Sequence, residues 1–132
     1  MPRNKVIKKE FNLSLCFVSL LFLNNGGKKM SVLLEFAMFP TDKGPSVSSH
    51  VSKVIAMIRE NCANFRLTAM GTIIETNTLD EALEIVKKAY DILGKESDRV
   101  YSNIKLDIRK GKENRLEGKI QSVEEKIGKV NR

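Results

Sequence analysis

The chain has 132 residues, of which 42% are hydrophobic, and this suits one globular domain with a core of ordinary size. Of its net charge of +7, the first 29 residues carry +5, while residues 30–132 hold 17 basic and 15 acidic residues. That nearly balanced remainder has no basic stripe interleaved with aromatic residues, so we expect no nucleic-acid partner. The two cysteines and the single histidine form neither a disulfide framework nor a metal-ligand spacing, so we expect no metal and no cofactor.

Residues 1–29 combine a basic start, an apolar run of eleven residues ("LSLCFVSLLFL") and a polar break. This order resembles a signal peptide, but no small-x-small cleavage site follows the run. A helix that spans a bilayer needs about 20 apolar residues, so the run is too short to form one. We therefore interpret residues 1–29 as an extension outside the fold, with Met30 as the biological start, and expect a cytoplasmic protein without a membrane partner.

The sequence after Met30 predicts a strand and then a helix. "SVLLEFAMFP" predicts a strand over residues 31–40, because it is rich in apolar residues on both faces and ends at a proline. A loop with Gly44 follows, and apolar residues then recur at helical spacing over residues 46–62. Serines at the start of this helix would cap its first backbone amides.

The middle of the chain predicts a hairpin and a second helix. "FRLTA" and "TIIET" are typical of strands and are joined by a tight turn at Met70 and Gly71. Thr78 and Glu81 form the Thr-x-x-Glu pattern of a capping box, so a helix begins there and ends at Gly94. We expect the buried face of this helix to consist of Ala82, Leu83, Val86, Ala89, Tyr90 and Leu93.

The last third of the chain predicts one more strand and one more helix. "RVYSNIKLDIRK" alternates strictly, with Val100, Ser102, Ile104, Leu106 and Ile108 on one face and Tyr101, Asn103, Lys105, Asp107 and Arg109 on the other. An Asn-x-x-Glu pattern at Asn114 then predicts a capped helix with a narrow apolar stripe of Leu116, Ile120, Val123 and Ile127. A stripe of this width suits one contact, including a contact with a second subunit.

The resulting order, β-α-β-β-α-β followed by a helix, predicts an α+β ferredoxin-like sandwich over residues 30–132. The first and third strands are then central, and both main helices cover the same face of the sheet. The other face is open, although Leu33, Ala37 and Phe39 make it too apolar for water. We therefore expect a homodimer or homotetramer that forms through this open face.

Polar residues among these apolar ones are the candidate ligand contacts. Glu35 would lie near Asn103 and Lys105 on the open face, and Glu75 joins either face depending on strand register. Charges on an otherwise apolar face are costly unless they pair or bind a ligand. An interface ion-pair network, for example Glu35 with Lys105, would satisfy them, and so would a pocket for a flat heterocycle. The candidate ligand-binding residues are Glu35, Phe36, Ser46, Ser48, Thr72, Glu75, Asn103 and Lys105.

The sequence contains no combination of residues that indicates a catalytic site. A single histidine provides no Ser-His-Asp or Cys-His arrangement, and the acidic residues lack metal-ligand spacing. Ser46 and Ser48 stand at a helix start, which suits capping or anion binding better than attack on a substrate. We therefore expect a protein that is not an enzyme.

Four stretches of the chain resemble the family of small thiamine-binding proteins: "EFAMFPTDKGPSVSSHV", "FRLTAMGTIIET", "DEALEIVKKAY" and "DRVYSNIKLDIRKG". The resemblance covers Met30 to Arg132 and excludes the first 29 residues. It implies a ferredoxin-like fold and dimers that form through the sheets and commonly assemble into tetramers. Some members of the family bind thiamine or related compounds, and others have no established ligand.

The chain departs from the pattern of this family at four positions. Asp42 stands where the loop of the family often has its first glycine, and Thr76 stands where a glycine commonly follows Glu75. Ala69 replaces the usual proline before Met-Gly, and Tyr90 occupies a helix position that is often histidine. Asp42 would narrow the loop beside the expected pocket or change its charge, whereas the fold would hardly change.

Residues and resemblance together predict the non-catalytic binding of thiamine or a related aminopyrimidine metabolite by an oligomeric domain. Glu35 or Glu75 would accept hydrogen bonds from the aminopyrimidine, Asn103 would point to the same side, and Ser46 and Ser48 would close the mouth of the pocket. The alternative is a structural or regulatory oligomeric module without a small-molecule ligand.

Overall fold

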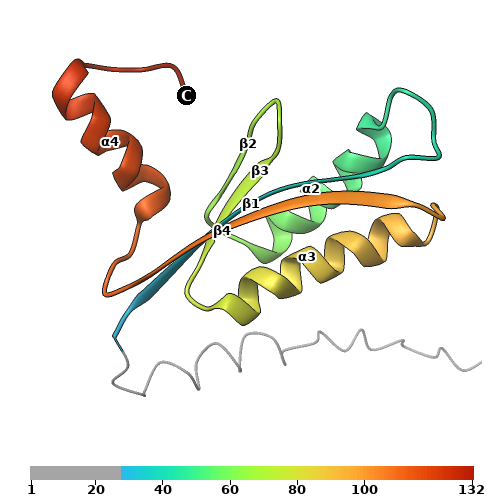
Figure 1. Ribbon diagram of the computed structural model, residues 1–132, viewed down its shortest axis with the longest axis horizontal. Helices are drawn as coiled ribbons and strands as arrows, with labels where there is room; N and C mark the ends of the chain where they lie inside the picture. The colour runs from blue at the N-terminus through green and yellow to red at the C-terminus, as the bar shows by residue number, and fades with distance from the viewer. Residues whose placement is uncertain (1–27) are drawn as a thin grey trace, which may run out of the picture.

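The fold has the element order that the sequence predicts (Figure 1). The structure is a computed structural model that describes residues 28–132, and the interpretation of the residues before them as an extension lies outside the described part. The elements are β1 (Met30–Pro40), α2 (Ser48–Asn61), β2 (Phe65–Leu67), β3 (Thr72–Thr76), α3 (Leu79–Gly94), β4 (Val100–Lys110) and α4 (Arg115–Ile127). The predicted α+β ferredoxin-like fold with an additional C-terminal helix is confirmed.

The sheet has the strand order β2-β3-β1-β4, so the first and third strands are central, as expected. All neighbouring strands are antiparallel, and Leu34 of β1 lies opposite Ile74 of β3 and Leu106 of β4. Residues directly opposite each other share a face of the sheet, so this register decides where every side chain points. The helices α2 and α3 cover the face of Leu34, and the core there comprises Val32, Leu34, Phe36, Met38, Val54, Ile58, Cys62, Ile74, Ala82, Ile85, Ala89 and Leu93.

The capping box of α3 is confirmed, but the buried face of this helix differs from the prediction. The Thr78 hydroxyl accepts a hydrogen bond from the Glu81 amide at 3.2 Å, and the Glu81 carboxylate accepts one from the Thr78 amide at 3.2 Å. The core contains Ile85, whereas Leu83 and Tyr90 are exposed. Because α3 contacts α2 as well as the sheet, its buried stripe is rotated away from the two residues that were expected inside.

The turn between β2 and β3 is centred one residue earlier than the sequence suggests. The Thr68 amide donates to the Gly71 carbonyl at 2.8 Å, which places Ala69 and Met70 at the centre of the turn. Gly71 immediately precedes β3, and a Cβ atom added to it would lie 3.0 Å from the Phe36 carbonyl oxygen. A side chain at position 71 would therefore crowd the backbone of β1.

Strand β4 is an edge strand whose apolar face is only partly covered. Ile104, Leu106 and Ile108 lie opposite core residues of β1 and therefore face the same side as the helices. They nevertheless remain 42%, 45% and 45% exposed, because α2 and α3 lie mainly over the central strands. The chain thus keeps a stripe of exposed apolar residues along one edge of its sheet.

Helix α4 begins over the open face, and its predicted cap is wrong. Asn114 has φ 52° and ψ 39°, a left-handed conformation, and its side chain makes no capping hydrogen bond. The first amides of α4 are bound instead by Glu75 of β3. Its carboxylate accepts hydrogen bonds from the amides of Arg115 at 2.9 Å and Leu116 at 3.0 Å. A carboxylate suits this place because the unpaired amides and the helix dipole both favour negative charge.

The remaining bonds of Glu75 belong to the sheet and its loops. One carboxylate oxygen also accepts from the Ser31 hydroxyl at 2.5 Å, and the other accepts from the Asn64 side-chain amide at 2.9 Å. Burial opposes the charge of Glu75, but the hydrogen bonds from Ser31, Leu116 and the Arg115 amide outweigh it and hold the pKa of this carboxyl below its ordinary value.

Other side chains attach the first turns of α4 to the two edge strands. The buried Arg115 guanidinium donates to the Asp107 carboxylate of β4, and Lys119 bonds the same carboxylate at 2.6 Å. Glu117 of α4 accepts from Arg66 of β2. The first turns of the helix are therefore held at one end of the sheet, and the helix then projects away from α2 and α3 (Figure 1).

The acidic residue in the second half of α4 is satisfied by the C-terminal tail. Glu124 accepts hydrogen bonds from Arg132 and Lys129, and these contacts lower the pKa of its carboxyl to about 2.

Among residues 28–132, no helix has the length and apolar character that a membrane crossing requires.

Substitution of Glu75 by glutamine tests the attachment of α4. The amide group of glutamine would face backbone amides that need an acceptor, so we expect the free energy of unfolding to fall by about 1–3 kcal/mol at neutral pH. Because the pKa of Glu75 is lowered in the folded state, its contribution is present above the ordinary value of 4.5 and is lost as the pH falls through the folded-state pKa. Chemical denaturation of wild type and Glu75→Gln should therefore give stabilities that converge below about pH 4.5.

The matched control is Glu84→Gln on the exposed side of α3, which should leave stability nearly unchanged at every pH. Equal stability of Glu75→Gln and wild type at neutral pH would contradict the capping role.

Candidate binding site

Helix α4 divides the open face of the sheet into two halves. At one end, Ser31 and Glu75 lie beneath the first turn of α4, and Glu75 accepts four hydrogen bonds from within the chain. A carboxylate has about four lone-pair positions, so Glu75 has no acceptor capacity left for a ligand. At the other end, the side chains of Glu35, Ala37 and Phe39 have no helix above them among the described residues.

Three cross-strand pairs whose side chains share this face form the uncovered half, which we call the open strip. Glu35 lies opposite Lys105, Ala37 opposite Asn103, and Phe39 opposite Tyr101. Residues two apart along a strand are separated by roughly 6.7 Å, so the open strip extends over roughly 13 Å. Because the side chain of Ala37 is small, the surface of the strip is lower at its middle than at its two ends. One end is formed by an ion pair and the other by an aromatic pair. The Phe39 and Tyr101 rings are 5.6 Å apart between centroids and tilted by 44°.

Glu35 keeps hydrogen-bonding capacity that Glu75 lacks. Its only hydrogen-bond partner among residues 28–132 is the Lys105 ammonium, at a distance of 3.4 Å from one carboxylate oxygen. The Glu35 side chain is 41% exposed, so this contact is a weak surface ion pair. The ion pair that the sequence analysis named as the alternative to ligand binding is thus present within one chain. Of the two glutamates, Glu35 is the one that can accept hydrogen bonds from a ligand.

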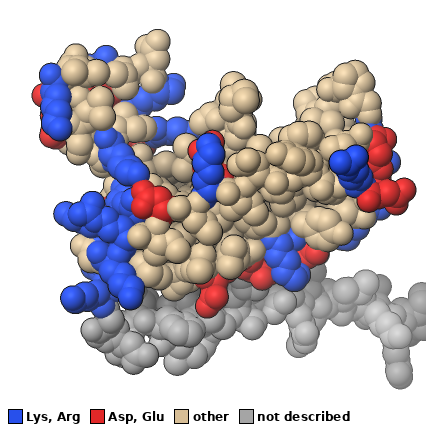
Figure 2. Space-filling view, viewed as in Figure 1, with Lys and Arg blue, Asp and Glu red and all other residues tan. Residues whose placement is uncertain are grey.

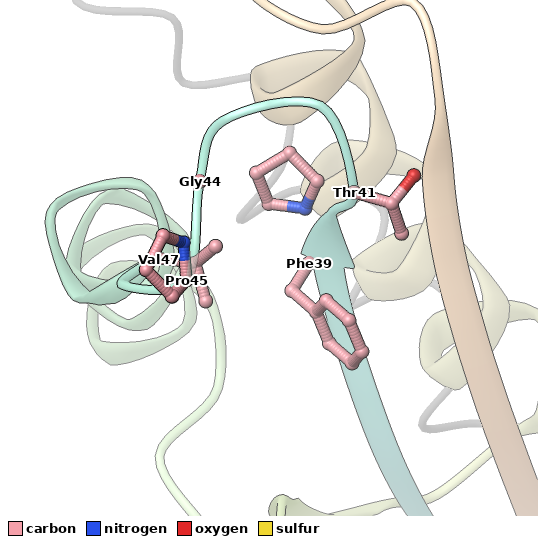
Figure 3. Close-up of a pocket in the computed structure, with 6 residues that line it drawn as sticks. Phe39, Thr41, Gly44, Pro45 and Val47 are labelled. Atoms are coloured by element: carbon pink, nitrogen blue, oxygen red, sulfur yellow. The ribbon is translucent and has the colours of Figure 1, made fainter.

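A hollow of about 380 Å³ adjoins the Phe39 end of the open strip (Figure 3). It lies between the end of β1 and the loop that leads into α2. Figure 3 shows Phe39 on one limb of this loop and Pro45 and Val47 on the other. The lining is mainly apolar and comprises Phe39, Pro40, Thr41, Gly44, Pro45 and Val47. Gly44 has φ +82°, a conformation that favours glycine and lets the loop turn back.

Asp42 fixes the loop beside this hollow. One of its carboxylate oxygens accepts from the Ser97 hydroxyl, and the other accepts from the Asp98 amide at 2.9 Å. The Thr41 amide adds a hydrogen bond to the Arg99 carbonyl at 2.9 Å. These bonds, the one from Ser97 first, lower the pKa of Asp42 and direct its charge to the connection between α3 and β4. Asp42 therefore anchors the loop and does not line the hollow.

Ser46 and Ser48 adjoin lining residues of the hollow in the sequence, but they are not among its lining residues and neither caps the helix. The N-cap residue of α2 is Val47, which makes no side-chain capping bond, so the expectation that serines cap this helix is wrong. Ser46 and Ser48 are exposed on either side of Val47. Their hydroxyls make no hydrogen bond among the described residues, which leaves them available at the edge of the hollow.

Three predicted site residues are not brought to the open strip: Glu75 lies beneath α4, and the other two lie on the opposite face of the sheet. Phe36 and Thr72 lie opposite each other on the helix-covered face, and both are buried there. Phe36 alternates with Glu35 along β1, so the two side chains must point to opposite faces. The structure thus groups Glu35, Asn103 and Lys105, places Ser46 and Ser48 near the adjoining hollow, and separates Phe36, Thr72 and Glu75 from them.

The sequence alone did not identify Ala37 or the apolar lining of the hollow as site residues. The signal for Ala37 was its place two residues after Glu35, where a small side chain leaves space. Pro45 and Val47 carried no such signal, because their position depends on how the loop closes.

Among residues 28–132, no three His, Cys, Asp or Glu side chains gather in a way that could hold a metal ion.

Comparison with protein families gives one match. The model of the family described as thiamine-binding protein matches residues 34–124. A UPF0045 protein of Methanocaldococcus jannaschii is 38% identical over 94 residues, which are 71% of this chain and 93% of that protein. A UPF0045 protein of Mycobacterium bovis is 32% identical over 95 residues, which are 72% of this chain and 93% of that protein.

Solved structures agree with the fold. The crystal structure of the hypothetical protein from M. jannaschii has a TM-score of 0.65 at 38% identity and covers 72% of this chain and 97% of that one. A protein of Thermotoga maritima that is assigned by name to thiamine biosynthesis or salvage has a TM-score of 0.58 at 18% identity, covering 70% and 98% of the two chains. At that identity the second likeness shows the fold alone.

Hydrogen exchange can test whether the hydrogen bonds of Asp42 hold this loop in place. We expect Asp42→Ala to speed the exchange of the backbone amides of residues 41–46, because the loop loses its two bonds to the connection before β4. Asp98→Ala is the matched control, since the structure uses only the backbone amide of Asp98. Exchange in Asp42→Ala that equals exchange in wild type would show that the loop is held by other contacts.

Proposed function

The chain belongs to the thiamine-binding protein family, and from this premise we propose that it binds thiamine or a related aminopyrimidine metabolite on the open strip without transforming it. The observation that carries the proposal is the difference between the two glutamates. Glu75 is fully bonded within the chain, whereas Glu35 keeps acceptor capacity beside a low, partly apolar surface.

The chemistry of the open strip suits a flat, protonatable ring. An aminopyrimidine offers an amino group and a protonated ring nitrogen, both of which donate hydrogen bonds to a carboxylate such as Glu35. Asn103 can both donate and accept, so it matches the edge of the same ring. A ring that lies over Ala37 would contact the aromatic pair of Phe39 and Tyr101. The hydroxyethyl or phosphate end would then extend toward Ser46 and Ser48 at the hollow.

A binding role without catalysis is supported by the groups that the strip offers. The carboxylate and the ammonium that the open strip offers, Glu35 and Lys105, are paired with each other. No nucleophile with an adjacent base lies on the open strip. The description of the family whose model matches residues 34–124 supports thiamine as the class of ligand.

A second copy of the chain is the proposed cover for the open face. Ala37 and Phe39 are half-buried there although no helix covers them, so the face would bury more apolar area against a partner. Two-fold packing of this face on its copy would turn the open strip into an enclosed pocket. The alternative is a structural or regulatory oligomeric module without a ligand, and the ion pair of Glu35 with Lys105 is the observation in its favour.

The substitution Glu35→Gln tests the ligand proposal. It removes the charge while keeping the shape, so we expect the affinity for thiamine or its aminopyrimidine precursor to fall by about 1.5–3 kcal/mol, roughly 10- to 150-fold. Stability should hardly change, because Glu35 makes one weak contact. Isothermal titration calorimetry against thiamine, its phosphates and its pyrimidine precursor measures the effect.

Glu60→Gln is the matched control for this experiment, since Glu60 is exposed on α2, on the other side of the sheet. Unchanged affinity in Glu35→Gln would remove Glu35 from the site. The absence of binding of any of these compounds to wild type would favour the structural module.

The proposed cover for the open face predicts an oligomer in solution. Light scattering of the full chain at micromolar concentration should give the mass of a dimer or a tetramer. A monomer that persists at this concentration would contradict both the buried face and the enclosed pocket.

A further inference from the structure

The turn between β2 and β3 borders the open strip on the side away from β4. The pairing of β1 with β3 ends where Phe36 lies opposite Thr72. One further step along both strands places Gly71 opposite Ala37, and the closeness of Gly71 to the Phe36 carbonyl agrees with this step. Thr72 belongs to the helix-covered face, so alternation puts Gly71 on the open face. Because Ala37 also lies opposite Asn103 of β4, the middle of the strip has the turn on one side and Asn103 on the other.

The free oxygen of the Glu35 carboxylate lies on the side of this turn. A Cβ atom added to Gly71 would be 3.8 Å from Glu35 Oε1. The Lys105 ammonium bonds the other oxygen, Oε2, from the β4 side of the strip. Among residues 28–132, no group donates a hydrogen bond to Oε1. A ligand that donates to this oxygen would therefore come next to the turn.

Thr68 holds the backbone of the turn in one conformation. Its hydroxyl donates to the Gly71 carbonyl at 2.9 Å and accepts from the amides of Met70 at 3.3 Å and Gly71 at 3.2 Å. The Thr68 amide adds a hydrogen bond to the Gly71 carbonyl at 2.8 Å. Because these bonds fix the backbone on both sides of Met70, only the side chain of this residue is left free to adjust.

Met70 places an apolar side chain at the tip of the turn without a packing partner. It is 84% exposed, more than any other large hydrophobic residue within residues 28–132. In Figure 1 the turn and α4 both rise from the sheet on the side away from α3. Figure 2 shows the turn as an uncharged projection between α4 and the loop that follows β1. A single exposed methionine is ordinary by itself. Here it stands in a fixed turn beside an unused carboxylate oxygen.

We propose that Met70 closes over the ring of the ligand that Glu35 binds, so that the ring lies between the Met70 thioether and Ala37. Methionine is unbranched and flexible, and its polarisable sulfur makes favourable contacts with aromatic rings. Asn103 contacts the edge of the ring, whereas Met70 covers its face. This inference rests on the proposed function, because it adds a specificity-determining residue to the same site.

Closure of Met70 also has a consequence for the hydrogen bond to Glu35. The Glu35 side chain is 41% exposed, so water competes for its carboxylate in the free protein. A thioether over the ring would exclude this water, and a hydrogen bond is stronger where the local dielectric constant is low. The site would therefore select a flat aromatic ring that donates to a carboxylate over a saturated amine of the same charge.

The first test removes the Met70 side chain. By isothermal titration calorimetry, Met70→Ala should bind the aminopyrimidine precursor of thiamine about 5- to 10-fold more weakly than wild type. Met70→Leu keeps an apolar side chain and should lose less. Leu67→Ala is the matched control, because Leu67 is also exposed on this hairpin but lies opposite Thr72 on the helix-covered face. Equal affinity of Met70→Ala and wild type would overturn the proposal.

The second test follows the oxidation of Met70 in the wild-type chain. Hydrogen peroxide converts accessible methionine to the sulfoxide, and mass spectrometry of peptides gives the rate at each methionine. We expect a saturating concentration of the aminopyrimidine precursor to slow the oxidation of Met70 several-fold. Oxidation of Met57, which packs against the core from α2, should not change. An unchanged rate at Met70 with the precursor bound would overturn the proposal.

The role of Met70 and the proposed function fail in different ways. If Glu35→Gln weakens binding while Met70→Ala does not, the proposed function stands and the role of Met70 is overturned. If wild type binds neither thiamine, nor its phosphates, nor its pyrimidine precursor, the proposed function fails and the role of Met70 fails with it.

Discussion

The alternation of side chains along β1 is the constraint on which the rest of the structure depends. β1 is central and pairs on both sides, so its even-numbered residues from Val32 to Met38 enter the core, and its odd-numbered residues from Leu33 to Phe39 face away from the helices. A shift of one residue would exchange the two sets and place Glu35 in the core. The same alternation brings Glu35 beside Lys105 and Phe39 beside Tyr101. Core and candidate site are thus specified by one strand, and the open strip cannot be moved without unpacking the core.

The carboxylate of Glu75 shows how an acid in a central strand can be required by the fold. The amides at the start of α4 need an acceptor, and Asn114 cannot supply one from its left-handed conformation. Glu75 supplies this acceptor from a strand that is far from α4 in the sequence. The Ser31 hydroxyl and the Asn64 side-chain amide donate the other two hydrogen bonds to its carboxylate. The open face is therefore occupied at one end by α4 and left uncovered at the other. This division separates a structural acid from one that is available for recognition, although both lie on the same face.

Most of the fold could be predicted from the sequence, because its signals are local. The strict alternation of β4 and the Thr78 capping box each depend on residues within a few positions, and both are confirmed. The site was less predictable, because its parts depend on contacts across the sheet. The face of Glu75 depends on strand register, and its role depends on where α4 docks. Helical spacing likewise could not show that α3 would turn Tyr90 outward, since the position of α2 decides that rotation. The pairing of Glu35 with Lys105 was among the alternatives that the sequence left open, because β1 and its neighbour β4 both alternate clearly and leave few registers.

Lys105 shows what each glutamate would lose on binding a ligand. Its ammonium bonds Glu35 at 3.4 Å, and both side chains are exposed, so this contact is a weak surface ion pair. A ligand that donates hydrogen bonds to Glu35 would compete only with Lys105 for this carboxylate. A ligand at Glu75 would have to replace four hydrogen bonds, two of which hold the first amides of α4. Recognition through Glu35 therefore leaves the fold intact, whereas recognition through Glu75 would detach α4 from the sheet.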